Sequence, residues 1–474
     1  MVIDDNSTQC TADTDCEQFG AHPTCEAGVC VASGLGPSGC FFGEPTTTDQ
    51  FATRCTTSQW FQFNNCALDM CDDAALQAAY QKTITPAPLG TVPPPLVTEP
   101  MPTINCADVS PNIIYITGST NLPPLLQAVQ PLLYKGTPAY TAVFAPQTSC
   151  KGAASVYDPS ASKHLITNTV NNWAFYYNAS GVQTFCLLDA AGNTVDVGES
   201  DVYPSSCGYS PTTGIADYTG PIQAIAFVVP AGSSQRAISA EAAHLVFAAG
   251  GDGGRAVPWI DPHYYFVRSS GTGTTQLPSR AINVDPTTWW GLDRLSAGNL
   301  VDSMKAIDPS VAERAIGLLS SDFADDNRDN LRELAFQQRG QRFAYLPDST
   351  PVSTDKANVR DGHYPIWGAI HFLAATDNGV PSAAARALVN QFIVPKLDEN
   401  LVSAIIGAGF VPPCAMKVTH SMEVGTLTAF QPPFGCSCFY ENQVNHTTAC
   451  HACTSPADCT SAAPACNYGF CEKQ

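Results

Sequence analysis

The amino-acid sequence predicts an α/β fold with small disulfide-rich segments at both ends. Between about residues 106 and 430, strand-like runs alternate with helix-like runs, which is typical of α/β proteins. The chain has 20 cysteines, and most of them lie near the two ends. Its 474 residues, 44% of them hydrophobic, are enough for two or three domains with a sizeable core.

We expect a cysteine-rich N-terminal region at 1–82 and a cysteine-rich C-terminal module at 431–474. Each contains one copy of an internal repeat, CTADTDCEQFGAHPTCEAGVC at 10–30 and CTSPADCTSAAPACNYGFC at 453–471. Both copies read C-x5-C, a spacer of eight or six residues, and C-x4-C. A segment of about 20 residues cannot bury a useful core, so two disulfides should hold each copy. The sequence leaves their connectivity open.

The even number of cysteines favours a disulfide framework that forms in an oxidising compartment, so we expect an exported protein: periplasmic, cell-surface or extracellular. A metal site is the weaker interpretation, because CHAC at 450–453 has no second CxxC at zinc-ribbon distance. The opening stretch, MVIDDNSTQC, lacks the basic region and apolar core of a signal peptide, so we expect that an export signal has been removed. No apolar run is long enough for a transmembrane helix.

A proline-rich segment at 83–105 precedes the predicted main domain at 106–430. Its seven prolines predict an extended, semi-rigid linker, or a strap lying on that domain.

The main domain contains several clear element signals. NIIYITGST at 112–120 predicts a buried strand that ends in a small polar turn, and NLPPLLQAVQPLLY at 121–134 predicts a helix with proline in its first turn. PIQAIAFVVP at 221–230 and HYYFV at 263–267 predict further strands. SAAARALVNQFIVPKL at 382–397 predicts an amphipathic helix.

Three turns have the form of an anion-binding loop. In α/β sheets, ligands bind beyond the carboxyl ends of strands, where the next helix offers free N–H groups and the positive end of its dipole. ITGSTNLPP at 116–124, FAPQTSCKG at 144–152 and FVRSSGTGTT at 266–275 each place small hydroxyl residues there. One such turn is common in proteins. Three of them, with Arg268 closing a strand, indicate a shared oxyanion site.

Several motifs resemble, in the same order, those of the phosphate-binding protein of ABC-type phosphate uptake, within the type 2 periplasmic binding protein superfamily. TGSTNLPPLL resembles that family's first loop, and VDVGESDVY at 195–203 resembles its VDFGASDAP stretch. VRSSGTGTT resembles its Arg-Ser-Asp-Gly-Ser-Gly-Thr loop, the most specific of these motifs. PWIDP, AIGLL and YPIWGAIHFL resemble further segments, so the motifs cover about 110–412.

The resemblance implies a two-lobed fold with phosphate between the lobes. Lobe I would comprise 110–227 and 364–430, and lobe II would comprise 228–363. Carried over residue by residue, the phosphate contacts would come from the three turns and the VDVGESDVY stretch: Thr120, Asn121, Ser149, Asp201, Arg268, Thr272, Gly273 and Thr274.

The chemistry of these residue types fits the expected ligand. An arginine pairs with two oxygens of a phosphate at once, and hydroxyl and amide groups add neutral donors. Near neutral pH phosphate still carries a proton, which Asp201 can accept. Sulfate carries none and would meet that carboxylate as an unpaired like charge, so Asp201 should select against it.

The sequence departs from the family pattern at three places. The family has aspartate two residues after its arginine, where this chain has Ser270. The second loop has lost glycines and contains Cys150 and Lys151, and Lys151 either adds a cationic contact or points into solvent. An insert at 152–195 either covers the cleft or binds something else.

Composition and missing motifs exclude other functions. With a net charge of −20, the chain should repel nucleic acid. It has no P-loop or dinucleotide fingerprint, so we expect no cofactor, and we expect no enzyme, although a phosphoester hydrolase on this fold is a minor alternative. The main alternative is an extracellular surface, assembly or adhesion protein that uses the binding-protein fold as a scaffold. Partners would be phosphate or a similar oxyanion, and a membrane permease or other surface proteins.

Overall fold

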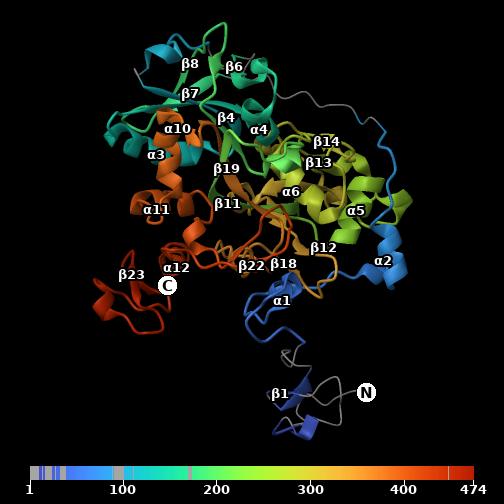
Figure 1. Cartoon of the computed structure of the whole chain (residues 1–474). Coiled ribbons are helices and arrows are strands. Elements are labelled where there is room, and N and C mark those ends of the chain that lie inside the picture. Colours follow the sequence, from blue (N-terminus) through green and yellow to red (C-terminus); the bar gives the residue numbers. More distant parts are fainter. Residues whose placement is uncertain are drawn as a thin grey trace.

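The computed structural model describes residues 10–12, 14–16, 24–26, 28–31, 39–87, 89, 101–109, 112–168, 173–446 and 448–473. One long sheet runs through the body, in the strand order β14-β13-β15-β11-β19-β10-β4-β5-β7-β8 (Figure 1). Helices pack on this sheet, and this arrangement confirms the predicted α/β fold class. About half of the predicted proline-rich linker, residues 88 and 90–100, lies outside the described residues.

The first sheet half is built around β4 (Ile113–Ser119), which pairs in parallel with both β5 (Thr141–Gln147) and β10 (Val197–Ser200). β19 (Trp367–Asp377) runs antiparallel to β10. The insert contributes β7 (Ala174–Tyr177) and β8 (Gln183–Cys186), which extend the sheet at its β5 edge. The strands of the insert therefore lengthen the sheet at this edge, beyond β5.

The second sheet half is built around β13 (Tyr265–Val267), which pairs in parallel with β14 (Leu292–Asp293) and β15 (Ile316–Ser320). β16 (Leu331–Glu333) lies on the far side of the crossing strand β11 (Ile215–Pro230). In both halves the central strand has its two parallel neighbours on opposite sides, so the strand order reverses beside it.

The crossing strand β11 joins the two halves. Its residues from Ile215 to Ala224 pair with β19, and those from Ile225 to Val228 pair with β15. The change of partner falls inside one continuous strand whose apolar side chains, Ile225 and Phe227 among them, are fully buried. The two sheet halves therefore share a core that continues from one half into the other, and the division into two lobes stays a prediction.

Helices form where the sequence signals predicted them. α3 (Pro123–Lys135) begins with two prolines and buries its leucine-rich face, and α10 (Ala383–Ile393) is capped by Ser382. α5 (Ala240–Ala249) is apolar on all sides and completely buried. The other α-helices are α1 (Thr48–Thr53), α2 (Asp73–Ala79), α4 (Ser149–Tyr157), α6 (Gly273–Ile282), α7 (Ala297–Lys305), α8 (Ser321–Asp325), α9 (Ala357–Asp361), α11 (Glu399–Gly407) and α12 (Ser437–Asn445).

A smaller sheet connects the N-terminal region to the body. β3 (Trp60–Phe61) pairs with β18 (Ala344–Tyr345), which continues through β17 (Ala335–Gln337) to β12 (Ala237–Ser239). The remaining strands form short two-stranded pairs or, for β20, extend β19: β6 (Leu165–Ile166), β9 (Asn193–Thr194), β20 (Val380–Pro381), β21 (Val418–Thr419) and β22 (Thr428–Ala429). Part of the cysteine-rich N-terminal region thus packs on the second sheet half.

All 20 cysteines form disulfides, which confirms the predicted framework. The two repeat copies share one connectivity, first to third and second to fourth: Cys10–Cys25 and Cys16–Cys30, and Cys453–Cys466 and Cys459–Cys471. Each copy contains one hairpin, β1 (Thr24–Glu26) with β2 (Val29–Val31), or β23 (Ala465–Asn467) with β24 (Phe470–Glu472). Figure 1 shows both modules at the outside of the body.

The two modules also share a local turn. The Asp15 carboxylate accepts hydrogen bonds from the backbone and hydroxyl of Thr11, and Asp458 accepts the same pair from Thr454. The threonine after the first cysteine and the aspartate before the second therefore have a structural role in both copies of the repeat.

Candidate functional site

The strand order reverses at two points, and we call the strand ends at each point a crevice, after the place where open α/β sheets bind ligands. In open α/β sheets, ligands bind beyond the carboxyl ends of strands where the strand order reverses. In the first half this point lies between β4 and β10, which end at Ser119 and Ser200. In the second half it lies between β13 and β15, and Arg268 follows the end of β13 directly.

Asp201 is the centre of the first crevice. It follows β10, is 4% exposed, and accepts hydrogen bonds from Asn121 Nδ2 at 2.5 Å and from Ser149 Oγ at 3.0 Å. Ser149 lies in the first turn of α4, whose N-cap is Thr148. The structure therefore brings together Asn121, Ser149 and Asp201, three of the predicted site residues.

The loop that follows Arg268 closes on this centre from the second half. The backbone N–H of Gly273 donates to Ser149 Oγ at 2.9 Å, and the N–H of Cys150 donates to the carbonyl of Gly271 at 3.0 Å. A Cβ added at Gly273 would lie 2.6 Å from the Cβ of Asp201, so only glycine fits this approach. Gly273 thus joins the same group of site residues.

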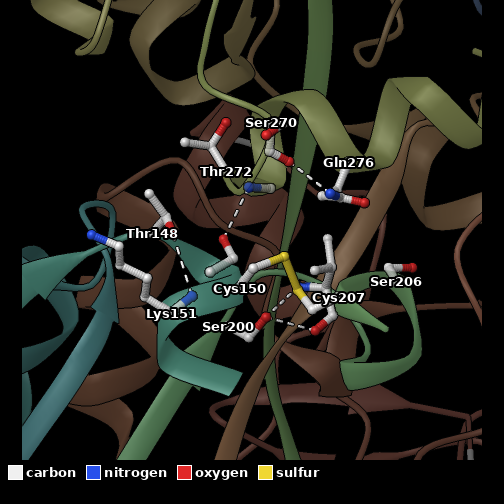
Figure 2. Close-up of a disulfide and its surroundings, with 12 residues drawn as sticks. Thr148, Cys150, Lys151, Ser200, Ser206, Cys207, Ser270, Thr272 and Gln276 are labelled. Carbon is white, nitrogen blue, oxygen red and sulfur yellow. Dashed lines mark hydrogen bonds between the residues drawn. A yellow bond between two sulfur atoms is a disulfide. The ribbon is translucent and has the colours of Figure 1, made fainter. Parts of the chain in front are cut away.

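A disulfide supports the α4 side of the contact. Cys150 pairs with Cys207, which lies in the turn that follows β10. Figure 2 shows this bond, with Ser270, Thr272 and Gln276 of the second half across from it. Lys151 points away from the site residues, because it is exposed and its Nζ donates to Gln147 Oε1 at 3.1 Å.

The Arg268 guanidinium is buried at the second crevice. It is 8% exposed, its Nη2 donates to the carbonyl of Leu295 at 3.1 Å, and its Nε has no partner among the described residues. Burial lowers the pKa of Arg268, while the nearby charges of Asp293 and then Asp201 oppose that shift. A buried charge with an unpaired donor is well suited to hold an anion.

Asp293 is a carboxylate outside the loop whose charge acts on Arg268. It lies on β14, where it is the register partner of Val267, the residue before Arg268. The loop has Ser270 where the loop that it resembles has aspartate, and the charge of Asp293 acts on the arginine from the neighbouring strand. Sequence reasoning missed Asp293 because the parallel pairing of β13 and β14 brings it there from 25 residues further along.

The three predicted threonines do not bond to the group of site residues around Asp201 in the part of the chain that the structure describes. Thr272 Oγ1 donates to the carbonyl of Ser269 at 2.8 Å and so stabilises its own loop. Thr120 is exposed and Thr274 is half-buried, and within the described part of the chain neither hydroxyl bonds to Asp201.

Two further residues extend the hydrogen-bond network to the opposite crevice. Gln223, on the crossing strand, accepts from Asn121 Nδ2 at 2.9 Å, and its Nε2 donates to Asp322 Oδ1 at 3.2 Å. Asp322 lies in α8, directly beyond β15, and burial raises its pKa to about 6. A polar residue in the apolar run PIQAIAFVVP was the one sequence signal that could have identified Gln223.

Glu199 is the second carboxyl group of the first crevice. It is fully buried on β10, and its Oε2 accepts the N–H of Ser119 at 2.5 Å. Burial, and next the charge of Asp201, raise its pKa well above the usual value. Gly118 makes room for it, because a Cβ there would lie 2.5 Å from Glu199 Oε2.

No protein-family model matches the sequence, and no curated protein is detectably similar to it. Among solved structures, a putative phosphate ABC transporter substrate-binding protein from Clostridium perfringens, with bound phosphate, is 12% identical, with a TM-score of 0.42 over 64% of this chain and 99% of its own. An ABC-type phosphate transport receptor from Vibrio cholerae is 13% identical, with a TM-score of 0.42 over 64% of this chain and 100% of its own. A possible phosphate binding protein from Planctomyces limnophilus DSM 3776 is 13% identical, with a TM-score of 0.39 over 65% of this chain and 94% of its own. Similarity at this level carries no argument about what this chain binds.

None of the helices in the described residues combines the length and the apolar character that crossing a membrane would need.

Proposed function

We propose that this protein is an exported solute-binding protein that holds an inorganic oxyanion, above all phosphate, between its two sheet halves. The observation that carries the proposal is the buried guanidinium of Arg268, whose Nε lacks a partner in the described residues. Leaving such a donor unpaired costs free energy, and an oxyanion offers oxygens in the geometry that a guanidinium prefers.

Binding would replace contacts that now join the two halves. Ser149 Oγ and the Gly273 N–H bond to each other, and both are groups that an oxyanion can also engage. An anion that enters between them breaks the bond between Ser149 and Gly273 and accepts one hydrogen bond from each of these groups instead. The gain per charge-assisted bond is about 1.5–3 kcal/mol, so several such bonds support micromolar affinity after the costs of desolvation.

Selectivity for phosphate would come from Asp201. This carboxylate lies beside the donors of the first crevice and can accept a hydrogen bond only from a ligand that still carries a proton. Phosphate does so near neutral pH and sulfate does not. Sulfate would therefore face a like charge with no compensating bond. The proposal involves no bond-making or bond-breaking step.

Titration calorimetry with phosphate, arsenate and sulfate at neutral pH tests the proposal. Phosphate and arsenate should bind, and sulfate should bind much more weakly. Arg268→Ala should weaken phosphate binding at least about a hundredfold, because it removes two charge-assisted bonds. Arg280→Ala is the matched control, since Arg280 is an exposed arginine on α6. A wild-type protein that binds none of these anions contradicts the proposal.

A surface or assembly protein is the second candidate, favoured by the two terminal modules with one connectivity. The C-terminal module packs on the body through Tyr468, whose hydroxyl donates to the Leu397 carbonyl at 2.8 Å. The test is a variant that lacks residues 10–31. Loss of self-association or cell attachment, with no anion binding in the wild type, would favour this candidate. Unchanged association in a protein that binds phosphate would exclude it.

A further inference from the structure

Two carboxyl groups lie side by side in the first crevice. Glu199 and Asp201 are two residues apart on one strand and its continuation, so their side chains project from the same face. Both are buried, at 0% and 4% exposure. Their separation in sequence and their shared face place the two carboxyls close enough for their charges to interact.

Two buried carboxyl groups on one face of a strand repel each other when both are ionised, so a proton on one of them is favoured. Glu199 Oε2 accepts the Ser119 N–H, while Glu199 Oε1 has no N–H or O–H donor among the described residues. Asp201 already accepts from Asn121 and Ser149. Asp201 thus has more donors to stabilise a negative charge, and Glu199 is the group that keeps the proton. Burial and the like charge of Asp201 raise the pKa of Glu199 in agreement with this assignment.

The elements around Glu199 bring no cation against it. β4 contributes the Ser119 N–H, and α4 contributes Gly152, where an added Cβ would lie 1.7 Å from the Glu199 carbonyl oxygen. β19 places Phe372 opposite Glu199.

The charged groups on those elements have other partners. Lys151 on α4 bonds to Gln147, and His371 on β19 bonds through Nδ1 to Asp217 at 2.7 Å. Arg268, from the second half, interacts electrostatically with Asp201. No positive charge therefore compensates a second negative charge in this crevice, within the described residues.

We infer that Glu199 and Asp201 share one proton, and that Glu199 is a specificity-determining residue that sets the pH range in which the site accepts an oxyanion. The inference rests on the proposed function and deepens it. With Glu199 protonated, the crevice presents one negative charge and Asp201 remains an acceptor for a proton-bearing anion. With Glu199 ionised, two carboxylates repel the anion and affinity falls.

The affinity test compares wild type with Glu199→Gln over about pH 5.5 to 9.5. Glutamine keeps an oxygen for the Ser119 N–H and a donor for Asp201 but cannot ionise. Phosphate itself ionises in this range, but this affects both proteins equally, so the ratio of their two phosphate Kd values at each pH removes the effect. We expect this ratio to change at least about tenfold across the range, with wild type losing affinity at high pH. Glu241→Gln is the control, because Glu241 is a buried carboxyl on α5 and burial raises its pKa as well. The phosphate Kd of this control should change with pH as that of the wild type does.

A second measurement separates this inference from the proposed function. Infrared spectroscopy of the ligand-free protein near neutral pH should show a protonated carboxyl band that Glu199→Gln removes. Absence of that difference, or parallel Kd profiles for wild type and Glu199→Gln, overturns the shared proton. A wild type that shows the band but binds no anion at any pH overturns the proposed function and leaves the carboxyl pair supported.

Discussion

Ser149 Oγ accepts the backbone N–H of Gly273 at 2.9 Å and, at 3.0 Å, donates to Asp201. Ser149 and Asp201 belong to the first sheet half, and Gly273 belongs to the second. One hydroxyl group thus connects the acceptor carboxylate of one half to the arginine-bearing loop of the other, and any ligand between the halves must displace or share this contact.

Gly273→Ala should weaken phosphate binding at least about tenfold, because the new methyl group would lie 2.6 Å from the Asp201 Cβ and push the loop away. Gly407→Ala is the control: Gly407 lies in α11 with nothing within 4 Å of an added Cβ. It should keep wild-type affinity and gain up to about 1 kcal/mol of stability. Calorimetry and denaturant unfolding measure both, and wild-type affinity in Gly273→Ala would contradict the contact's role.

Asp293→Asn should lower phosphate affinity several-fold by removing the carboxylate that faces Arg268 from β14. The reason is orientation. The charge of Asp293 attracts the Arg268 guanidinium, and without it the guanidinium is held in the described residues only by the bond from Nη2 to the Leu295 carbonyl, so binding must fix a freer side chain. Asp302→Asn, at an exposed position on α7, is the comparison variant. Equal affinities for the two variants in calorimetry would remove Asp293 from the site.

Lys356→Met should destabilise the protein by about 3–5 kcal/mol, measured by denaturant unfolding. Lys356 is 2% exposed, and its Nζ lies 2.6 Å from Asp325 and 3.0 Å from Asp348. Removing the ammonium group takes away the buried cation of this cluster and leaves Asp325 and Asp348 paired with Arg328 alone among the described residues. Lys305→Met, at an exposed position on α7, should cost almost nothing. Similar losses for both would mean that the buried ion pairs contribute little.

Asp322 makes stability fall as pH rises. Its pKa in the folded protein is about 6, raised by burial from 3.8, so the unfolded chain ionises first. The contribution of protonated Asp322 to the free energy of unfolding is fully present below about pH 4 and is lost as the pH rises to about 6. A pKa difference of about two units makes this contribution about 3 kcal/mol. Asp322→Asn keeps an acceptor for Gln223 and should remove this dependence. Unfolding curves at about pH 4.5 and pH 7.5 test it, and an unchanged pH slope in the variant would contradict the assignment.

Peptide mapping under non-reducing conditions should recover the linked pairs Cys10–Cys25 and Cys16–Cys30 and, separately, Cys453–Cys466 and Cys459–Cys471. Four cysteines allow three connectivities, so recovering the same one in both modules is informative. A different pairing in either module would contradict the shared architecture of the repeat.

Local signals in the sequence predicted the local elements well. Helix α3 and strand β4 were predicted because prolines, apolar runs and small turn residues lie within each element. The crossing strand was predicted too short, at 221–230. The strand begins at Ile215 and passes the proline at 221 through a register shift between Thr219 and Ile222, where no ladder hydrogen bond is required.

The site was predictable only in part, because local sequence signals reveal only some of its residues. Asn121, Ser149, Arg268 and Gly273 lie in turns whose composition marks them, and Asp201 lies in a recognisable motif. Asp293, Gln223 and Asp322 carry no local signature, because strand pairing and the fold of β11 bring them to the site. Glu199 stands inside the motif, but its importance depends on burial, which the motif does not reveal.

The terminal modules have a consequence for biogenesis. Every bridge within a repeat copy joins cysteines 12 to 15 residues apart, and none of these bridges connects a copy to the body. Oxidation of the N-terminal copy therefore requires nothing that is synthesised after it, and oxidation of the C-terminal copy can wait until the body is complete. The two modules can mature at opposite ends of chain synthesis, each as a self-sufficient cross-linked unit.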